Sequence, residues 1–189
     1  MKNRGVLVLV LWLSGCVSVA KIEGGERMVG ERLSLTIDGA WNHVQAPGMG
    51  PAQTWTMEGL AIDQLLIFSG LKDGELIHAP PPQGQKRFAF RATMQPDEIV
   101  GLFDGVLTRD GSTFTLVKLA PAEVGGQQGF RFEYALVRKV DGVRLSGLGF
   151  AAVSRGELFA VVYQAPRLVF FARHAARIEH IGRSLRIRG

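Results

Sequence analysis

The residue types that most often carry catalytic chemistry are few in this sequence, and their spacing does not suit catalysis. The only cysteine is Cys16, and no Gly-x-Ser-x-Gly motif holds a nucleophilic serine on a strand-to-helix turn. No two of the four histidines are four residues apart, the spacing at which helical side chains share a face. We therefore expect no metal site and no cofactor, and surface or edge positions for His43, His78, His174 and His180.

One glycine motif matches a nucleotide-binding pattern. Gly147, Gly149 and Ala152 fit G-x-G-x-x-A, which indicates a dinucleotide site only when a strand precedes it and a helix follows it. Here the motif lies inside an expected strand, and a turn and another strand follow. We interpret its glycines as positions where a strand bulges or where an aromatic ring packs closely.

The carboxylates show no paired arrangement. Several aspartates directly precede a glycine, which is typical of turns; they are Asp38, Asp73, Asp104, Asp110 and Asp141. Glu58 and Asp63 flank an expected strand and have no assigned role. Trp41 and Trp55 suit a core, or the wall of a pocket beside the 46–53 loop. A site assembled from carboxylates distant in sequence remains an open alternative.

The first sixteen residues form a separate pattern. Lys2 and Arg4 precede an unbroken apolar run, 6–13, and small residues follow it before Cys16. A positive start, a short apolar region and small residues at a cleavage point are typical of a secretory signal. The run is too short to remain as a transmembrane helix, which needs about 20 residues.

Leu13-Ser14-Gly15-Cys16 resembles the lipobox of bacterial lipoproteins. In that family the cysteine sulfur is joined to diacylglycerol, the preceding peptide is removed and the new amine is acylated. The resemblance implies a signal peptide over residues 1–15 and fatty acids such as palmitate on Cys16, and two or more acyl chains anchor a protein stably. In the enterobacterial sorting pattern, an aspartate directly after the cysteine favours retention at the inner membrane. In this chain Val17 and Ser18 follow the cysteine instead. The resemblance therefore favours the periplasmic face of the outer membrane, with the outer leaflet of the inner membrane as the alternative.

The remaining chain divides into a short leader and one body. Residues 16–30 contain three glycines and little periodicity, and we expect them to form a lipidated tether. Residues 31–189 are expected to form a single globular domain, because domains usually have about 100–200 residues. Loss of Lys2 and Arg4 with the signal leaves 20 of the 22 basic residues against 17 acidic ones. This mild excess does not indicate nucleic-acid binding.

Hydrophobic periodicity predicts strands and two helices. Strands are expected at 33–37, 54–57, 62–68, 75–78 and 88–91, and then in a four-strand meander at 113–120, 128–139, 143–153 and 157–165. The segment 75–78 is expected to return on its predecessor through a turn at Lys72-Asp73-Gly74. Helices are expected over 93–108 and after Pro166. Leu158 to Tyr163 is apolar on both faces, which predicts a central strand with helices on both sides of the sheet.

This order of elements is an α+β fold, in which an antiparallel sheet is packed by two helices. The chain resembles the PsbP/Mog1-like α-β-α sandwich, a fold seen in several small bacterial lipoproteins. The resemblance rests on Trp41-Asn42, on the meander at 113–165, and on Tyr163-Gln164-Ala165-Pro166 before the terminal helix. No active-site motif transfers with it, because a fold does not specify a function.

The terminal helix has a basic stripe opposite its apolar arc. Arg173, Arg177 and His180 share this side, and Glu179 and Arg183 are spaced as an i,i+4 ion pair. In a protein tied to a membrane, the stripe is a candidate surface for lipid phosphates or for a partner. A solvated helix face is the plain alternative.

Together these features predict a membrane-anchored envelope lipoprotein that acts as a non-enzymatic binding or accessory module. Its partners would be the membrane, through the lipid, and an envelope protein or lipid. An envelope hydrolase and a carrier of small apolar ligands are the alternatives. An enzyme would show a deep pocket with convergent ionisable groups of perturbed pKa, and a carrier would show a dry cavity between sheet and helix.

Overall fold

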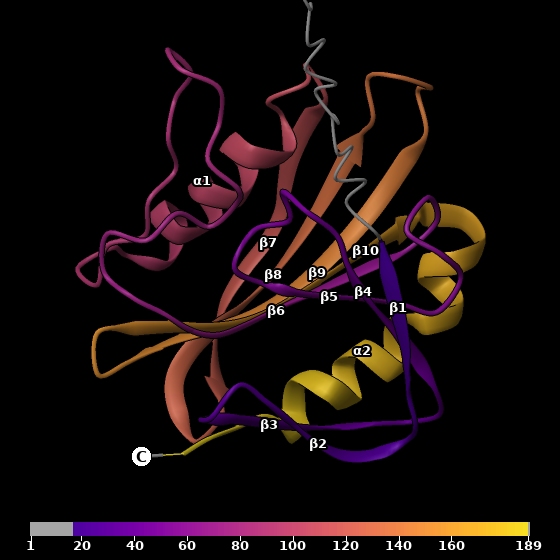
Figure 1. Ribbon diagram of the computed structural model, residues 1–189, viewed down its shortest axis with the longest axis vertical. Coiled ribbons are helices and arrows are strands. Elements are labelled where there is room, and N and C mark those ends of the chain that lie inside the picture. Colours follow the sequence, from indigo (N-terminus) through magenta and orange to yellow (C-terminus); the bar gives the residue numbers. More distant parts are fainter. Residues whose placement is uncertain (1–16, 189) are drawn as a thin grey trace, which may run out of the picture.

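The computed structural model describes residues 17–188, and within them a large antiparallel sheet separates two helices (Figure 1). The eight strands of this sheet follow the order β1-β4-β5-β6-β10-β9-β8-β7. They are β1 (Ser18–Ile22), β4 (Trp41–Gln45), β5 (Gln53–Thr56), β6 (Gln64–Leu71), β7 (Thr113–Val124), β8 (Gln127–Val137), β9 (Arg144–Ser154) and β10 (Glu157–Pro166). A second sheet contains β2 (Gly25–Val29), β3 (Leu33–Ile37) and β11 (Arg186–Ile187). The helices are α1 (Pro96–Leu107) and α2 (Ala172–Ser184), and the π-helical segment η1 (Arg167–Phe171) leads into α2.

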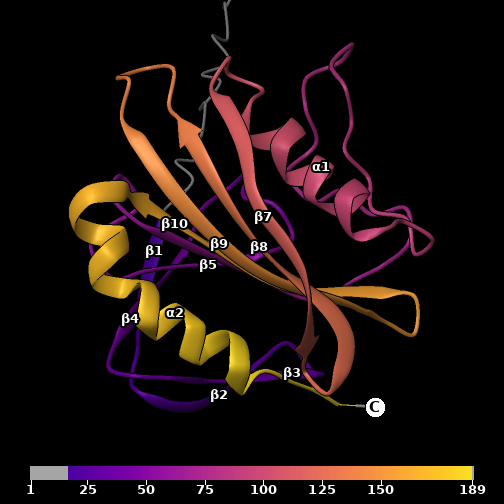
Figure 2. The ribbon, with the colours of Figure 1, turned by 180° about the vertical axis from the view of Figure 1, so that it is seen from behind.

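The predicted C-terminal meander is confirmed. In β8, Phe130, Phe132 and Tyr134 are buried, whereas Arg131 and Glu133 lie half-buried on the other face. Strands β9 and β10 lie inside the sheet and are apolar on both faces, so both faces need a cover. Figures 1 and 2 show α1 over one face and α2 over the other. The α+β sandwich predicted from the sequence is therefore the observed architecture.

Aromatic side chains fill the layer between α1 and the sheet. Phe103 of α1 lies between Phe68 and Phe132, with ring centroids 5.8 and 5.7 Å apart. The helix begins at Pro96, and the Gln95 amide donates a hydrogen bond to the Glu98 carboxylate at 2.7 Å. Proline suits the first helical turn because its missing amide has no partner there in any case. The helix predicted over 93–108 is thus confirmed, with slightly narrower bounds.

On the other face, α2 packs between the large sheet and β3. Ile178, Ile181 and Leu185 are fully buried in this layer. A Cβ on Gly182 would lie 2.4 Å from Phe150 Cε2, so this glycine lets the helix sit directly on the aromatic ring. No helix among residues 17–188 is long and apolar enough to cross a membrane.

The glycines of the nucleotide-like motif have a packing role. A Cβ on Gly147 would lie 2.0 Å from Tyr134 Cζ, and one on Gly149 would lie 2.3 Å from Phe132 Cε1. Both residues stand inside β9, and no helix follows the motif directly. The interpretation that these glycines admit aromatic rings is therefore confirmed.

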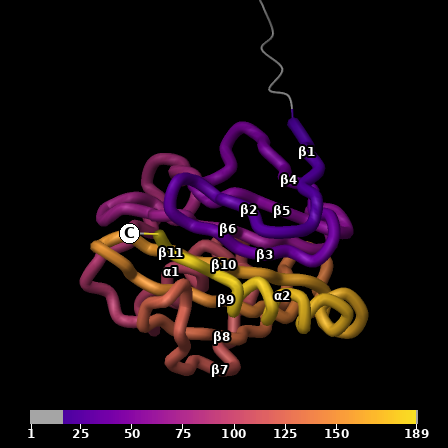
Figure 3. Tube along the Cα trace, turned by 90° about the horizontal axis from the view of Figure 1, so that it is seen from below, coloured from indigo at the N-terminus to yellow at the C-terminus, as the bar shows by residue number. Residues whose placement is uncertain are grey.

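The tether predicted over residues 16–30 is wrong from Ser18 onward. Strand β1 pairs with β4 along its whole length, beginning with Ser18 opposite Gln45, and β2 pairs with β3. β1 lies at the edge opposite β7 (Figure 3) and four of its five side chains are exposed, so its sequence lacks an apolar alternation. The folded body therefore starts before the predicted boundary at residue 31. Cys16 and the signal peptide expected over 1–15 lie outside the described residues.

Two other local predictions need correction. The segment 75–78 does not return on β6, because backbone hydrogen bonds join it to the segment 88–91 instead. Asp104-Gly105 is not a turn and lies inside α1. The helix needs a glycine there because a Cβ would lie 2.1 Å from Phe88 Cε1.

Candidate functional site

A buried polar cluster lies on the α2 side of the sheet, where the loop between β5 and β6 meets β10 and α2. Asp63, which is 1% exposed, accepts hydrogen bonds from the amides of Met57 and Glu58 at 3.1 and 2.8 Å. It also accepts one from the Thr56 hydroxyl. These bonds satisfy the buried carboxylate and hold the loop in one conformation.

Tyr163 of β10 connects this loop to the core. Its hydroxyl lies 3.5 Å from Asp63 Oδ2, and its ring packs against Trp41 and Phe171 with centroids 6.4 and 6.1 Å away. Burial, and then the charge of Asp63, raises the pKa of Tyr163 far above its ordinary value, so the phenol stays protonated. Trp41 and Trp55 are both buried in the core.

His174 of α2 faces the same loop. It is 5% exposed, and its Nε2 lies 3.0 Å from Glu58 Oε1. The hydrogen bond from His174, followed by the charge of Arg173, lowers the pKa of the Glu58 carboxyl. The expectation of a surface or edge position is wrong for His174, because the loop at 57–63 covers this side of α2. His78 and His180 are exposed, and His43 is half-buried.

Each member of the predicted basic stripe contacts another part of the chain. Arg173 Nη1 lies 3.2 Å from Glu58 Oε1, Arg177 Nη1 lies 2.9 Å from the sulfur of Met57, and His180 Nε2 lies 3.8 Å from Asp38 Oδ1. The stripe is therefore partly neutralised by loops that pack beside α2.

The predicted pair between Glu179 and Arg183 is wrong. Glu179 instead accepts a hydrogen bond from Arg131 Nε of β8 at 3.0 Å, so α2 is tied to the sheet. Arg131 also pairs with Glu133 beside it. Glu179 pairs with Arg131 because the folded sheet places Arg131 beside the helix. The spacing of residues along the helix gives no information about this contact.

A carboxylate–imidazole pair such as Glu58 and His174 can serve in proton transfer. These two residues, however, do not line the large groove between α1 and the β7–β8 hairpin. Within residues 17–188, no three residues among His, Cys, Asp and Glu are placed to hold a metal ion. The geometry of the cluster is that of a structural network whose acceptors are satisfied by nearby donors.

A large groove lies on the opposite face, between the start of α1 and the β7–β8 hairpin. Its volume is about 1120 Å³. Buried or half-buried apolar side chains form much of it, among them Met94, Ile99, Leu119, Phe130 and Val153.

Local sequence shapes the hairpin wall of this groove. Gly125 and Gly126, with φ of +63° and +79°, close the β7–β8 hairpin in a tight turn between the paired residues Val124 and Gln127. Pro121 on the edge strand β7 cannot donate to a further strand, which discourages another strand from covering the groove by sheet extension.

The charged residues that line the groove are acidic. Its described lining includes Asp97 and Glu123, both exposed, and no basic residue. Gln127 and Gln128 add uncharged polar groups from the hairpin. Sequence reasoning missed this groove, because its walls come from three separate segments, 94–99, 119–130 and 152–153, and only the fold brings them together.

Comparison with known proteins identifies the architecture. No family model matches the chain, and no curated protein matches it. Among solved structures, it is similar to the cyanobacterial PsbP protein (CyanoP) of Synechocystis sp. PCC 6803, with a TM-score of 0.58 and 12% identity over 95% of this chain and 98% of that chain. The chain has a PsbP-like fold. LpqN, a protein involved in cell envelope biogenesis of Mycobacterium tuberculosis, matches with a TM-score of 0.48 and 11% identity over 92% of each chain.

The resemblance to a PsbP-like sandwich, predicted from the order of elements, is confirmed at the level of the fold. At 12% identity the likeness to CyanoP extends to the fold alone. The function of this PsbP-like chain has to be argued from its own groove, cluster and charges.

Proposed function

We propose that this protein is a lipid-anchored protein of the bacterial envelope and that it works as a non-enzymatic binding module. The anchor is supported by the motif Leu13-Ser14-Gly15-Cys16, which places the only cysteine where a lipid would be attached. Val17 and Ser18 after the cysteine favour the outer membrane, with the inner membrane as the alternative.

The observation that carries the binding role is the groove between α1 and the β7–β8 hairpin. Its volume of about 1120 Å³ exceeds the roughly 300–1,000 Å³ that is typical of small-molecule pockets. An apolar floor of this extent suits an apolar segment of a partner protein. The carboxylates of Asp97 and Glu123 favour basic residues beside that segment.

An enzymatic role has weaker support. Its strongest support is the contact between Glu58 and His174 at 3.0 Å, but these groups lie on the α2 face and the groove lies on the α1 face. Substrate bound in the groove would therefore be separated from them by the sheet. Hydrolysis of ester or phosphate substrates that is lost in both Glu58→Gln and His174→Gln would favour the enzyme instead.

Site-specific crosslinking tests the binding role. A photoreactive amino acid at Gln128, on the groove, is expected to crosslink one envelope protein in cells that produce the acylated protein. The same amino acid at Ala176, exposed on α2, serves as the control. Equal crosslinking from both positions contradicts the proposal.

A charge placed on the groove wall sharpens the test. Pro121→Arg should abolish the crosslink from Gln128, because it adds bulk and a positive charge where we expect a basic partner. Pro47→Arg, on an exposed loop outside the groove, should preserve it. If Pro121→Arg instead abolishes only the binding of an apolar fluorescent dye, the protein is a carrier of small ligands.

A further inference from the structure

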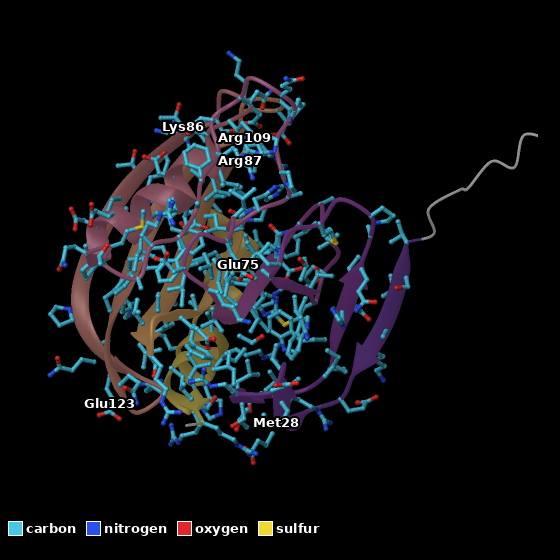
Figure 4. All side chains as sticks on the ribbon, turned by 60° about the vertical axis from the view of Figure 1, so that its left-hand side comes forward. Met28, Glu75, Lys86, Arg87, Arg109 and Glu123 are labelled. Carbon is cyan, nitrogen blue, oxygen red and sulfur yellow. The ribbon has the colours of Figure 1, made fainter. Side chains whose placement is uncertain are left out.

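Three cations without an ion pair gather at the end of the molecule where α1 finishes. Lys86 and Arg87 lie on the loop before Phe88, and Arg109 follows α1; Figure 4 shows the three together. Within residues 17–188, ion pairs form at other positions, including Arg173 and His180 of α2, and none involves these three.

A fixed aromatic ring organises these charges. Lys86 Nζ and Arg109 Cζ lie 5.3 and 5.5 Å from the centroid of the Phe88 ring. That ring is seated on α1 at Gly105, where a Cβ would lie 2.1 Å from Phe88 Cε1. The glycine inside the helix thus allows the aromatic platform on which two cations are held near each other.

The turn between β8 and β9 lies at the same end of the molecule. The Lys139 amide donates a hydrogen bond to Ser112 Oγ at 3.0 Å, so the turn packs beside the segment that follows Arg109. Lys139 is exposed, and the neighbouring Val140 is 81% exposed. We call the surface formed by Lys86, Arg87, Arg109, Lys139 and Val140 the basic end.

The loop that carries Lys86 and Arg87 starts beside the segment that follows β4, the strand paired with β1. Ser18 pairs with Gln45, and the loop that follows Gln45 brings Gly50 so close to His78 that a Cβ would lie 2.8 Å from His78 Cα. The loop carrying Lys86 follows His78 directly. In the sequence, only Val17 separates Cys16 from β1.

We infer that the basic end binds anionic phospholipid headgroups of the membrane that carries the anchor. This inference rests on the proposed lipid at Cys16, because an anchor two residues before β1 keeps the body against the bilayer. Each basic residue near an anionic surface strengthens binding about fivefold. An exposed valine among the cations adds a side chain that can enter the interface. Glu123, which lines the groove, lies at the opposite end of the molecule from the three cations in Figure 4, so this part of the groove would stay clear of the bilayer.

Depth measurements on the acylated full-length protein test this inference. A nitroxide label is placed on Val140→Cys or, as a control, on Met28→Cys, a 44% exposed position at the other end of the molecule (Figure 4). The protein is reconstituted in phosphatidylethanolamine vesicles with or without phosphatidylglycerol. The label at 140 should be shielded from a water-soluble relaxation agent severalfold more than the label at 28, and only when phosphatidylglycerol is present.

Charge reversal provides the matched comparison. Lys86→Glu with Arg87→Glu should remove the shielding at 140, whereas Arg173→Glu with Arg177→Glu should leave it unchanged, since Arg173 and Arg177 already contact the chain itself. Equal accessibility at positions 140 and 28 in both vesicles overturns the inference, as does shielding that needs an added envelope protein. The mass of the purified chain reports acylation of Cys16 separately, so a missing anchor and a missing headgroup contact are distinct outcomes.

Discussion

Each face of the sheet is covered by a helix, but the two faces differ in the number of buried polar side chains that they contain. On the α2 face, Asp63, Tyr163 and His174 are buried and hydrogen-bonded. The α1 face is built on apolar and aromatic contacts and leaves an open groove at one end. The comparison teaches that clustered ionisable side chains need not mark the place where a ligand binds, since here their hydrogen bonds are used to hold a loop.

The largest effect is expected from the aromatic layer of the α1 face. Phe103→Ala should lower the free energy of unfolding by about 3–5 kcal/mol, because it removes a buried ring from between Phe68 and Phe132 and leaves a cavity. Urea unfolding measures the change. A loss below about 1 kcal/mol would mean that α1 is not packed as described.

The next effect comes from the polar network of the α2 face. Asp63→Ala should cost about 3 kcal/mol, since it leaves the buried Thr56 hydroxyl and the amides of Met57 and Glu58 without their acceptor. Asp63→Asn, which retains one carbonyl oxygen, is the control and should cost less. Equal stability of Asp63→Ala and the native protein in thermal unfolding would remove the structural role assigned to this cluster.

A smaller effect depends on pH. The pKa of Glu58 is lowered in the folded state, mainly by the hydrogen bond from His174. A carboxyl with a lowered folded-state pKa stabilises the native state above its unfolded pKa, and this contribution is lost as the pH falls through the folded pKa. Stability should therefore decline below about pH 4.5, the unperturbed value, and the decline should be shallower in Glu58→Gln.

Other carboxyls with lowered pKa do not obscure this comparison. Asp73, Asp110 and Asp141 also have lowered pKa values through hydrogen bonds of their own. They contribute alike to both proteins, so the difference between the two pH profiles reports Glu58. Parallel profiles would show that the contact with His174 does not affect folding.

The smallest effect on stability is expected at the groove. Pro121→Arg changes an exposed side chain on an edge strand, and such surface changes usually lie within about 0.5 kcal/mol. The variant should therefore unfold like the native protein while it loses the partner crosslink. A large loss of stability would mean that the groove wall is part of the core, which would weaken the contrast between the two faces.

The sequence was sufficient for the elements with strong periodicity. Phe130, Phe132 and Tyr134 alternate along β8, and Ile99, Leu102 and Phe103 share one side of α1, so burial of each element follows from its own pattern. Strand β1 was missed because its exposed side chains carry no alternation and its place depends on backbone pairing with β4.

The candidate sites were less accessible to sequence reasoning. His174 was expected at the surface because its burial comes from a loop more than 100 residues earlier, which contributes Glu58. The groove needs α1 beside a hairpin that follows it, and the basic end joins Lys86, Arg109 and Lys139 from three segments. Non-local packing decides each of these, and single-sequence patterns do not encode it.

Both the groove orientation and the headgroup contact depend on a lipid at Cys16. Mass spectrometry of the N-terminal peptide of the protein isolated from its native envelope tests that dependence directly. We predict a chain that begins at Cys16 and carries a diacylglyceryl thioether and an acylated amine. A free thiol at this position, or a chain that begins at another residue, would contradict the membrane-anchored function.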